Sequence, residues 1–168
     1  SMQKYQFNIT VKDKILNELF NDIRFRQAMS LAIDRNDINQ TLFFGLAKPR
    51  QWGVEPTSPF YEDWMSTYYA SYDPEEANRL LDEMGLKKGP DGMRVRPDGE
   101  PLTIVLWDAI KRIPLSEIVA EYWRKVGVQV TINPSTREAF KQALIANEVH
   151  ASVWFADVVA EKDMYQRP

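Results

Sequence analysis

The sequence predicts an α/β fold in which a mixed sheet carries flanking helices. Apolar and polar residues alternate over Tyr5–Val11, which is the pattern of a half-buried strand. Further along the chain, the β-rich runs Leu102–Trp107 and Val128–Ile132 are separated by a helical apolar stripe. Strands and helices that alternate in this way form a sheet with right-handed crossovers.

Two helices are expected after the first strand. Asn21 or Asp22 can cap the first helix, and Asn36 can cap a second helix that runs to about Gly45. The apolar residues of the first helix recur at helical spacing: Phe25, Ala28, Met29, Ala32 and Ile33. We expect the pair to form a short helical hairpin.

Residues 46–72 are expected to form an ordered loop rich in aromatic side chains. Pro49, Pro56 and Pro59 interrupt this segment, so one long helix or strand does not fit. Its aromatic residues are Trp52, Phe60, Tyr61, Trp64, Tyr68, Tyr69 and Tyr72.

The clearest helix of the chain follows this loop. Asp73 is a favourable N-cap and Pro74 occupies the first helical position, where proline is tolerated. Gly85 ends the helix. Its apolar stripe consists of Ala77, Leu80, Leu81 and Met84.

A hairpin is expected between this helix and the central strand. Turn signals at Asp91-Gly92 and Pro97-Asp98-Gly99 lie on either side of Met93–Arg96. The β-rich run Leu102–Trp107 follows directly and is the expected partner of Met93–Arg96.

The remaining elements form a strand–helix–strand unit and one more helix and strand. The apolar stripe of the first of these helices ends at Gly127 and consists of Leu115, Ile118, Val119, Tyr122, Trp123 and Val126. A further helix is expected from about Thr136 to Asn147, with Phe140, Ala143 and Leu144 buried, before a last strand at Ser152–Phe155.

The composition of the chain argues against several classes of function. The chain has 168 residues, which suits one domain with its own core. Its 21 basic and 24 acidic residues are interspersed, so no basic field is present for nucleic acid or an anionic membrane. No apolar run reaches the roughly 18–20 residues that span a bilayer. The absence of cysteine excludes disulfides, thiolate metal sites and a cysteine nucleophile.

Catalytic motifs are not found. His150 is the single histidine, beside a predicted strand, and the chain has no nucleophile elbow or second histidine for a zinc site. The glycines form no phosphate-binding loop. The acid pairs Glu75-Glu76 and Asp82-Glu83 flank an apolar stripe and are read as a solvated helix face. We therefore expect no catalytic residue, no metal and no cofactor.

Aromatic side chains are the best candidates for ligand contacts. Flat rings offer a large contact area at little entropic cost, and Trp and Tyr add a hydrogen-bonding group. Trp52, Tyr61 and Trp154 are the candidates, and core filling is the alternative for each. For Trp64, Tyr68 and Tyr72 we expect a position in the core beneath the loop.

Two stretches carry a family resemblance. They are residues 21–35, NDIRFRQAMSLAIDR, and residues 72–85, YDPEEANRLLDEMG. Together with Val126–Ile132 and Val153–Asp157, they resemble the solute-binding proteins of ABC importers of the oligopeptide, dipeptide and nickel type. The resemblance covers most of the chain.

The resemblance implies one lobe of a type II periplasmic-binding-protein-like fold. Residues 1–168 would form the second lobe of a larger two-lobed protein, excised from it, with residues 1–2 as a cloning remnant. Such a protein is periplasmic or extracellular, can be lipid-anchored, and captures a solute by closing with its N-terminal lobe before it docks on an ABC permease. Excision would explain why the amino terminus shows no signal peptide.

The resemblance also gives a role to Asp157. Trp154-Phe155-Ala156-Asp157 is similar to a stretch in which peptide-binding relatives place an aspartate against the free amino terminus of the ligand. The usual continuation of that stretch is replaced here by Val158-Val159-Ala160-Glu161, so an ordinary strand-end aspartate is the alternative.

The sequence leaves alternatives open for the solute and for the class of function. Oligopeptides and oligosaccharides are both carried by relatives, and residues 81–102 resemble the sugar-transport branch as much as the peptide branch. A carboxylate-dependent glycan hydrolase would need two convergent acids roughly 5–9 Å apart. A protein-interaction module that uses the aromatic loop 46–72 would expose an apolar patch.

Overall fold

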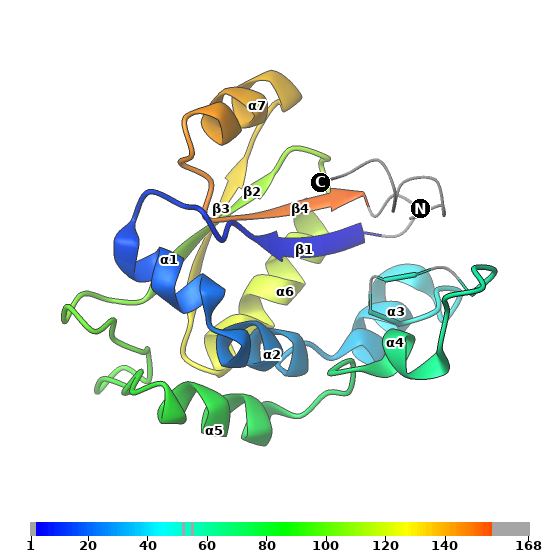
Figure 1. The fold of residues 1–168 in the computed structure, drawn as a ribbon, viewed down its shortest axis with the longest axis horizontal. Helices are drawn as coiled ribbons and strands as arrows, with labels where there is room; N and C mark the ends of the chain where they lie inside the picture. Colours follow the sequence, from blue (N-terminus) through cyan, green and yellow to red (C-terminus); the bar gives the residue numbers. More distant parts are fainter. Residues whose placement is uncertain (1–2, 52, 55, 156–168) are drawn as a thin grey trace.

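The computed structural model describes residues 3–51, 53–54 and 56–155. The strands are β1 (Gln3–Phe7), β2 (Thr103–Asp108), β3 (Gln129–Pro134) and β4 (Ala151–Phe155), and they form one sheet in the order β1-β4-β2-β3. β2 runs parallel to β3 and β4, whereas β1 runs antiparallel to β4. Helices flank this mixed sheet (Figure 1), so the predicted fold class is confirmed.

β1 starts and ends earlier than the predicted strand Tyr5–Val11. The side chain of Asn8 accepts hydrogen bonds from the backbone N–H and the hydroxyl of Thr10, and it donates to the carbonyl of Val149. These bonds turn the chain out of the sheet after Phe7. Ile9 is consequently 50% exposed rather than part of the alternating strand.

Helix α1 (Lys14–Asn21) lies in a stretch for which no element is predicted. The carboxylate of Asp13 caps it by accepting from the N–H groups of Ile15 and Leu16, both at 3.0 Å. Helix α2 (Ile23–Leu31) follows directly and is capped by Asp22, which confirms one of the two predicted caps.

Helix α3 (Arg35–Phe43) starts one residue before the predicted cap, so the assignment of Asn36 as N-cap is wrong. The carboxylate of Asp34 accepts from the N–H groups of Asn36 and Asp37 at 3.0 and 2.9 Å. Asn36 is therefore a donor within the first turn. Aspartate and asparagine are both good N-caps, so the path of the backbone decides which of Asp34 and Asn36 caps the helix.

Among the described residues of the aromatic segment 46–72, only Asp63–Thr67 form a helix, the short α4, and the rest are largely irregular. The predicted core positions of Trp64, Tyr68 and Tyr72 are wrong, because their exposed fractions are 53%, 53% and 43%. The rings of Trp64 and Tyr68 pack edge to face at the surface, with centroids 5.7 Å apart. Helix α5 (Pro74–Glu83) follows, with Asp73 as its cap, as predicted.

A short hairpin forms across the turn at Pro97-Asp98-Gly99, as expected: the N–H of Arg96 donates to the carbonyl of Glu100 at 2.8 Å, and the N–H of Leu102 donates to the carbonyl of Arg94 at 2.9 Å. Isolated bridges join Lys88 with Arg94 and Val95 with Pro101, but the pairing does not continue into the rest of the predicted run Leu102–Trp107. β2 pairs with β3 on one side and β4 on the other. Neither of its edges is free to accept Met93–Arg96 as an antiparallel partner.

The side chain of Arg94 is the centre of this reversed segment and is 1% exposed. Its guanidinium donates to the carbonyls of Leu86 and Val126, to the carboxylate of Asp82 at 2.6 Å and to the side-chain oxygen of Asn78 at 2.8 Å. These bonds join α5, the segment after it and the turn before β3. The buried charge is thus fully hydrogen-bonded.

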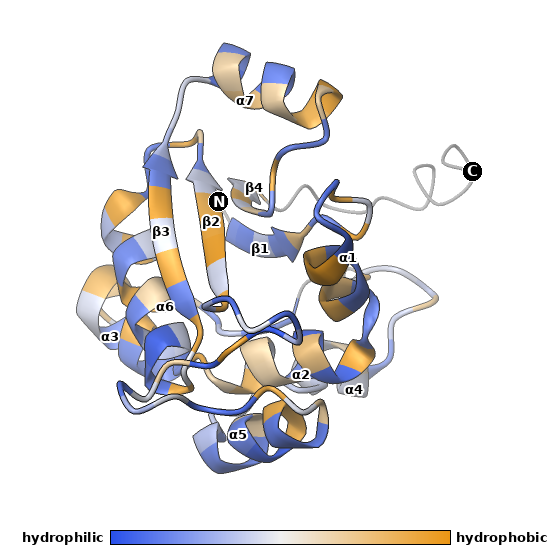
Figure 2. Cartoon of the chain, turned by 90° about the vertical axis from the view of Figure 1, so that its left-hand side faces the viewer, coloured by the Kyte–Doolittle hydropathy of each residue, from blue (hydrophilic) through white to orange (hydrophobic). Residues whose placement is uncertain are grey.

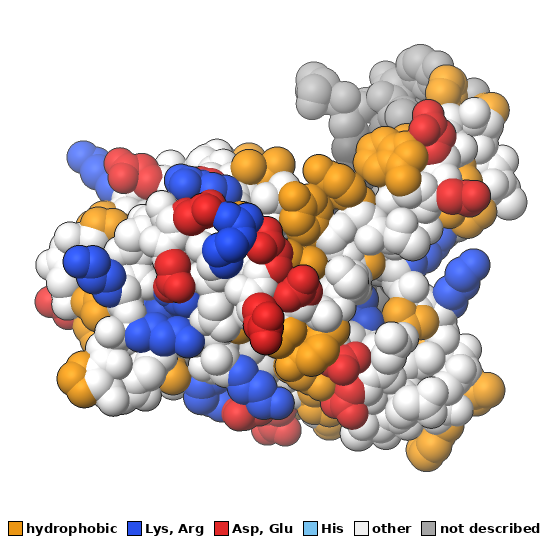
Figure 3. All heavy atoms as spheres, turned by 90° about the horizontal axis from the view of Figure 1, so that it is seen from below, with side chains coloured by type: hydrophobic (Ala, Val, Ile, Leu, Met, Phe, Trp, Pro, Cys, Tyr) orange, Lys and Arg blue, Asp and Glu red, His pale blue; other side chains and the backbone are white. Residues whose placement is uncertain are grey.

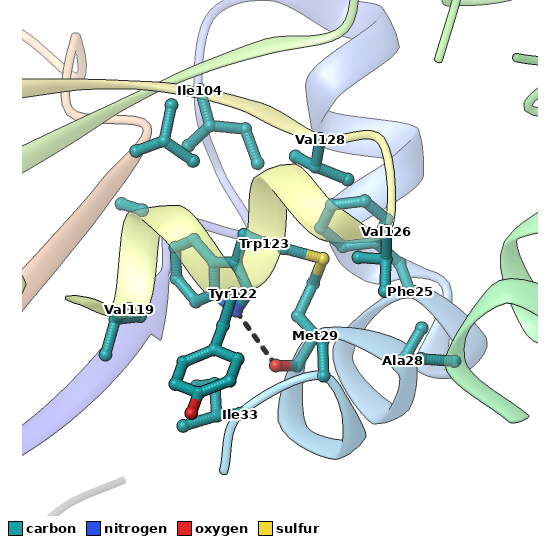
Figure 4. Close-up of a cluster of buried hydrophobic side chains, with 14 of the residues drawn as sticks. Phe25, Ala28, Met29, Ile33, Ile104, Val119, Tyr122, Trp123, Val126 and Val128 are labelled. Atoms are coloured by element: carbon teal, nitrogen blue, oxygen red, sulfur yellow. Dashed lines mark hydrogen bonds between the residues drawn. The ribbon is translucent and has the colours of Figure 1, made fainter. Parts of the chain in front are cut away.

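Helix α6 (Ile113–Lys125) connects β2 to β3 and packs on one face of the sheet. The indole N–H of Trp123 donates to the carbonyl of Met29 in α2 at 2.9 Å (Figure 4). The ring of Phe7 in β1 lies 5.4 Å from that of Trp123. This indole therefore joins the sheet, α6 and α2 in the main core.

Helix α7 (Arg137–Ile145) connects β3 to β4 and lies on the opposite face, apart from the other helices (Figures 1 and 2). Ile104 and Leu106 of β2 face the main core, whereas Trp107 packs on the small cluster of Ala109, Phe140, Ala143 and Val149. Burial of Phe140 and Ala143 is as predicted. Leu144 is 47% exposed, so its predicted burial is wrong, because its neighbour Ala143 faces the sheet.

Replacement of Arg94 by methionine is expected to lower the free energy of unfolding by about 3–5 kcal/mol, because the carbonyls of Leu86 and Val126 would lose their donor in a buried site. Urea denaturation of the isolated chain measures this. Arg79→Met is the control, since Arg79 forms only exposed ion pairs with Glu76 and Glu83 on α5. Equal losses in both variants would contradict the role assigned to Arg94.

Candidate ligand-binding site

The carboxyl ends of β2, β3 and β4 meet at one edge of the sheet. Asp108, the last residue of β2, is in register with Pro134 of β3 and Val153 of β4. The connection from β2 leads to α6 on one face, and the connection from β3 leads to α7 on the other. Ligands of open α/β sheets bind outside the carboxyl ends of parallel strands at such a point. This edge is therefore the candidate site.

Two loops border a depression of about 350 Å³ at this edge. Residues 109–111 follow β2, and residues 135–138 follow β3 and begin α7. Lys111 and Arg137 contribute positive charge to the lining and Glu138 contributes negative charge. The hydroxyl of Thr136 caps α7 by accepting from the N–H of Ala139. The depression thus offers hydroxyls and charges of both signs.

Asp108 fixes the first of these loops. Its carboxylate is buried and accepts from the N–H groups of Ile110 and Arg112, both at 3.1 Å, and from the hydroxyl of Ser116 at 2.9 Å. Arg112 precedes α6 without a side-chain cap, so Asp108 supplies the acceptor for the start of that helix. These bonds make Asp108 a positioning residue of the loop.

Trp154 lies in β4 close to the same edge and is half-buried. Its ring stacks on Phe140 of α7 with centroids 5.4 Å apart and an interplanar angle of 18°. The guanidinium carbon of Arg137 lies 5.9 Å from the ring centre. Trp154 therefore fills part of the α7 cluster and keeps a portion of its surface accessible.

Tyr61 lies elsewhere, in the aromatic segment that passes beside α3 and α4 (Figure 1). It is half-buried, and its hydroxyl donates to the hydroxyl of Ser66 at 3.1 Å. No described contact connects it with Trp154. Trp52 and Asp157, the other two candidates, lie outside the described residues.

Arg137 and the loop residue Lys111 are the functional candidates that the sequence did not reveal. Each belongs to a loop or first helical turn that follows a parallel strand: Lys111 comes after β2 and Arg137 after β3. A parallel pairing of β2 with β3 would predict both residues as site candidates, because residues that follow parallel strands lie at the edge where ligands bind.

The described residues contain no group of three or more His, Cys, Asp or Glu that could hold a metal ion. None of the helices in this part of the chain is long and apolar enough to cross a membrane. On the face that Figure 3 shows, Lys and Arg side chains are intermixed with Asp and Glu, so that face carries no field of one sign.

His150 is a half-buried residue next to β4. Its Nδ1 atom accepts from the backbone N–H of Val105 at 3.3 Å, on the neighbouring strand. Burial lowers the pKa of His150, while the charges of Asp13 and Arg96 act on it in opposite directions. His150 is thus a partly packed residue beside a strand.

Comparison with solved structures defines the class of fold. An oligopeptide-binding protein OppA superposes with a TM-score of 0.91 and 40% sequence identity, over 96% of this chain and 26% of that chain. The mixed sheet and its flanking helices are thus those of a periplasmic binding protein.

The family follows from the sequence comparisons. The model described as bacterial extracellular solute-binding proteins, family 5 Middle, matches residues 1–165. The chain belongs to this family, as the resemblance of its motifs predicts.

Curated relatives are considerably longer than this chain. A "Probable ABC transporter-binding protein" of Deinococcus radiodurans is 30% identical over 133 residues, which are 76% of this chain and 22% of that protein. A dipeptide-binding protein of Escherichia coli is 30% identical over 118 residues, or 66% and 19%. A periplasmic alpha-galactoside-binding protein of Rhizobium meliloti is 30% identical over 129 residues, or 71% and 18%. The chain spans about a fifth of these relatives.

The lowered pKa of His150 predicts a pH-dependent stability. Its contribution is fully present above the ordinary pKa of about 6.5 and is lost as the pH falls towards the lowered value, because the unfolded chain binds the proton more readily. The variant His150→Asn keeps an acceptor near Val105. Between pH 7 and 5, the wild type should lose stability faster than this variant, by at most about 1.4 kcal/mol per pH unit in urea titrations. Parallel curves would contradict the assignment.

Proposed function

We propose that this chain is part of one lobe of an extracytoplasmic solute-binding protein that captures peptides for an ABC importer. The likeness to OppA over nearly the whole chain, at 40% identity, carries this proposal. The full-length protein would be two-lobed, with the missing N-terminal lobe supplying the opposite wall of the cleft and a permease receiving the closed form. A periplasmic or extracellular location, with or without a lipid anchor, follows from the same proposal.

The edge of the sheet at the carboxyl ends of β2, β3 and β4 would form this lobe's side of the ligand-binding cleft. The accessible surface of Trp154, stiffened by Phe140, suits an apolar side chain or the plane of a peptide bond. Lys111 and Arg137 can attract a carboxylate, and Glu138 and the hydroxyl groups can bind amides. The family resemblance assigns the ligand's amino terminus to Asp157, two residues beyond the end of β4.

Trp52 and Tyr61 are further proposed ligand contacts. Trp52 would serve as a stacking surface, and Tyr61 would touch the ligand at the rim of the cleft. The hydroxyl of Tyr61 already donates to Ser66, so its ring rather than its hydroxyl would meet a ligand. A single wall excludes little water and makes half of the contacts. The isolated chain is therefore expected to bind only weakly, and capture would require closure of both lobes.

An oligosaccharide is the second candidate solute. The observation that favours it is the 30% identity with the alpha-galactoside-binding protein of Rhizobium meliloti. The accessible part of the Trp154 ring could stack on a sugar face as well as on a peptide. Competition between peptides and galactosides for the full-length protein separates the two candidates.

A binding role fits the acids of the site better than glycan hydrolysis. Asp108 is buried and its carboxylate already accepts from Ile110, Arg112 and Ser116, so it is not placed to donate a proton to a glycosidic oxygen. Glu138 would lack a second free carboxylate among the residues that line the depression. The family is one of binding proteins.

In the full-length protein, Asp157→Ala is expected to weaken peptide binding by about 1–3 kcal/mol, because a charge-assisted hydrogen bond to the ligand would be lost. Isothermal calorimetry with a mixed peptide library and then with the selected peptide measures the change. Glu75→Ala, on the exposed first turn of α5, is the control and should bind as the wild type does. Unchanged affinity of Asp157→Ala would remove Asp157 from the site, and sub-micromolar binding by the 168-residue chain would contradict the two-lobe proposal.

A further inference from the structure

Two distant points of the aromatic segment are joined by hydrogen bonds and close a loop of residues 51–69. The backbone N–H of Gln51 donates to the carbonyl of Ser66 at 2.8 Å, and the side-chain amide of Gln51 donates to the carbonyl of Tyr69 at 3.2 Å. Loops that a rigid scaffold holds in place often carry the binding residues of a protein. This loop contains Tyr61, one of the proposed ligand contacts.

The hydroxyl of Ser30, in α2, is the centre of this closure. It donates to the carbonyl of Tyr69 at 2.7 Å, and it accepts from the side chains of Gln51 at 2.7 Å and Arg35 at 2.8 Å. A hydroxyl group can donate one hydrogen bond and accept two, so this hydroxyl is fully used. The loop 51–69 is therefore attached to α2 through a single oxygen atom.

Arg35, the first residue of α3, strengthens the attachment. Its guanidinium donates to the carbonyl of Ser30 at 2.9 Å and to the carbonyl of Ala70 at 3.2 Å. In the described part of the chain it forms an ion pair with no carboxylate, and burial lowers its pKa to about 10. The group stays charged at neutral pH, and hydrogen bonds from a charged donor are stronger than those between neutral groups. Arg35 thus holds the end of the loop against the end of α2.

Further hydrogen bonds connect this closure with Tyr61. Ser66, whose carbonyl accepts from Gln51, also accepts from the hydroxyl of Tyr61 at 3.1 Å and donates to the carbonyl of Asp63 at 2.9 Å. Tyr61 is half-buried, so part of its ring is accessible. A ring that is already held in place loses little conformational freedom when a ligand binds to it.

We propose that Ser30, Arg35 and Gln51 are positioning residues, which fix the loop 51–69 and, through Ser66, the ring of Tyr61. The inference rests on the proposed function, because it takes Tyr61 as a contact of the bound peptide. The hydroxyl of Tyr61 is already engaged, so a ring fixed at this place would select peptides with an aromatic or large apolar side chain. The three positioning residues determine this preference without touching the peptide.

Hydrogen exchange in the full-length protein tests the closure without a ligand. Gln51→Leu and Ser30→Ala remove the side-chain hydrogen bonds of the closure. Ser30→Thr keeps the hydroxyl, and Gln40→Leu makes the same change as Gln51→Leu at an exposed position of α3. The backbone amides of residues 57–69 should exchange about tenfold faster in the first two variants and at the wild-type rate in the other two. Unchanged exchange in Gln51→Leu would overturn the proposal even if Ser30→Ala does not fold.

The peptides that the full-length protein retains from a mixed library of short peptides test the preference. The wild type should enrich peptides with an aromatic or large apolar side chain by about threefold, and Tyr61→Ala should lose this enrichment. Gln51→Leu and Ser30→Ala should lose it as well. A merely structural role would lower the amount of peptide bound and leave its composition unchanged.

The outcomes separate this inference from the proposed function. Retention of peptides with the same composition by the wild type, Gln51→Leu and Ser30→Ala would overturn the positioning role and leave peptide capture in place. Unchanged composition in Tyr61→Ala would likewise overturn the inference alone, because Tyr61 would then not touch the peptide. Retention of no peptide by the wild type would overturn the proposed function and, with it, the role of Tyr61.

Discussion

The C-terminal half of this structure depends on one buried cation, Arg94. Its side chain joins α5 and the turn before β3, and its backbone joins two further points, since its N–H donates to Gly127 at 2.7 Å and its carbonyl accepts from Leu102 at 2.9 Å. The end of α6 and the start of β2 are thus fixed against the same residue. Gly127 has a φ of +90°, and a Cβ there would lie 2.8 Å from Cγ of Arg94. Arg94 therefore anchors the chain just before β2 and β3, at the end of the sheet opposite to the one where Asp108 fixes the loop before α6.

Elements specified by neighbouring residues could be predicted from the sequence. Asp73 and Pro74 begin α5 as expected, because a cap and a first-turn proline act within a few residues of each other. The cap of α3 was misplaced since Asp34 and Asn36 are equally suitable by type, and the backbone path decides between them. The predicted hairpin stops at Leu102 and does not include β2, for a long-range reason. β3 and β4 occupy both edges of β2, and pairing across the sheet is not encoded in any short stretch.

The candidate site was less accessible to sequence reasoning than the fold. Trp154 could be chosen as an aromatic residue beside a motif, but its stacking on Phe140 and its proximity to Arg137 depend on the crossover through α7. Exposure of Trp64, Tyr68 and Tyr72 could not be derived, because an irregular segment has no periodicity that separates inner from outer faces. The burial of Arg94 could not be predicted either, since charged residues ordinarily lie at the surface.

The isolation of α7 has a consequence for how this family can diversify. α7 packs through a small apolar cluster of its own, on the face of the sheet opposite the main core. Substitutions in this helix and in the loop before it can therefore reshape the surface around Trp154 without disturbing Trp123, Phe7 or Met29. In the proposed site, recognition would thus depend on one apolar cluster and stability mainly on the other. If the solute binds at this edge, as proposed, a few changes there could alter the solute preference while the interior stays the same.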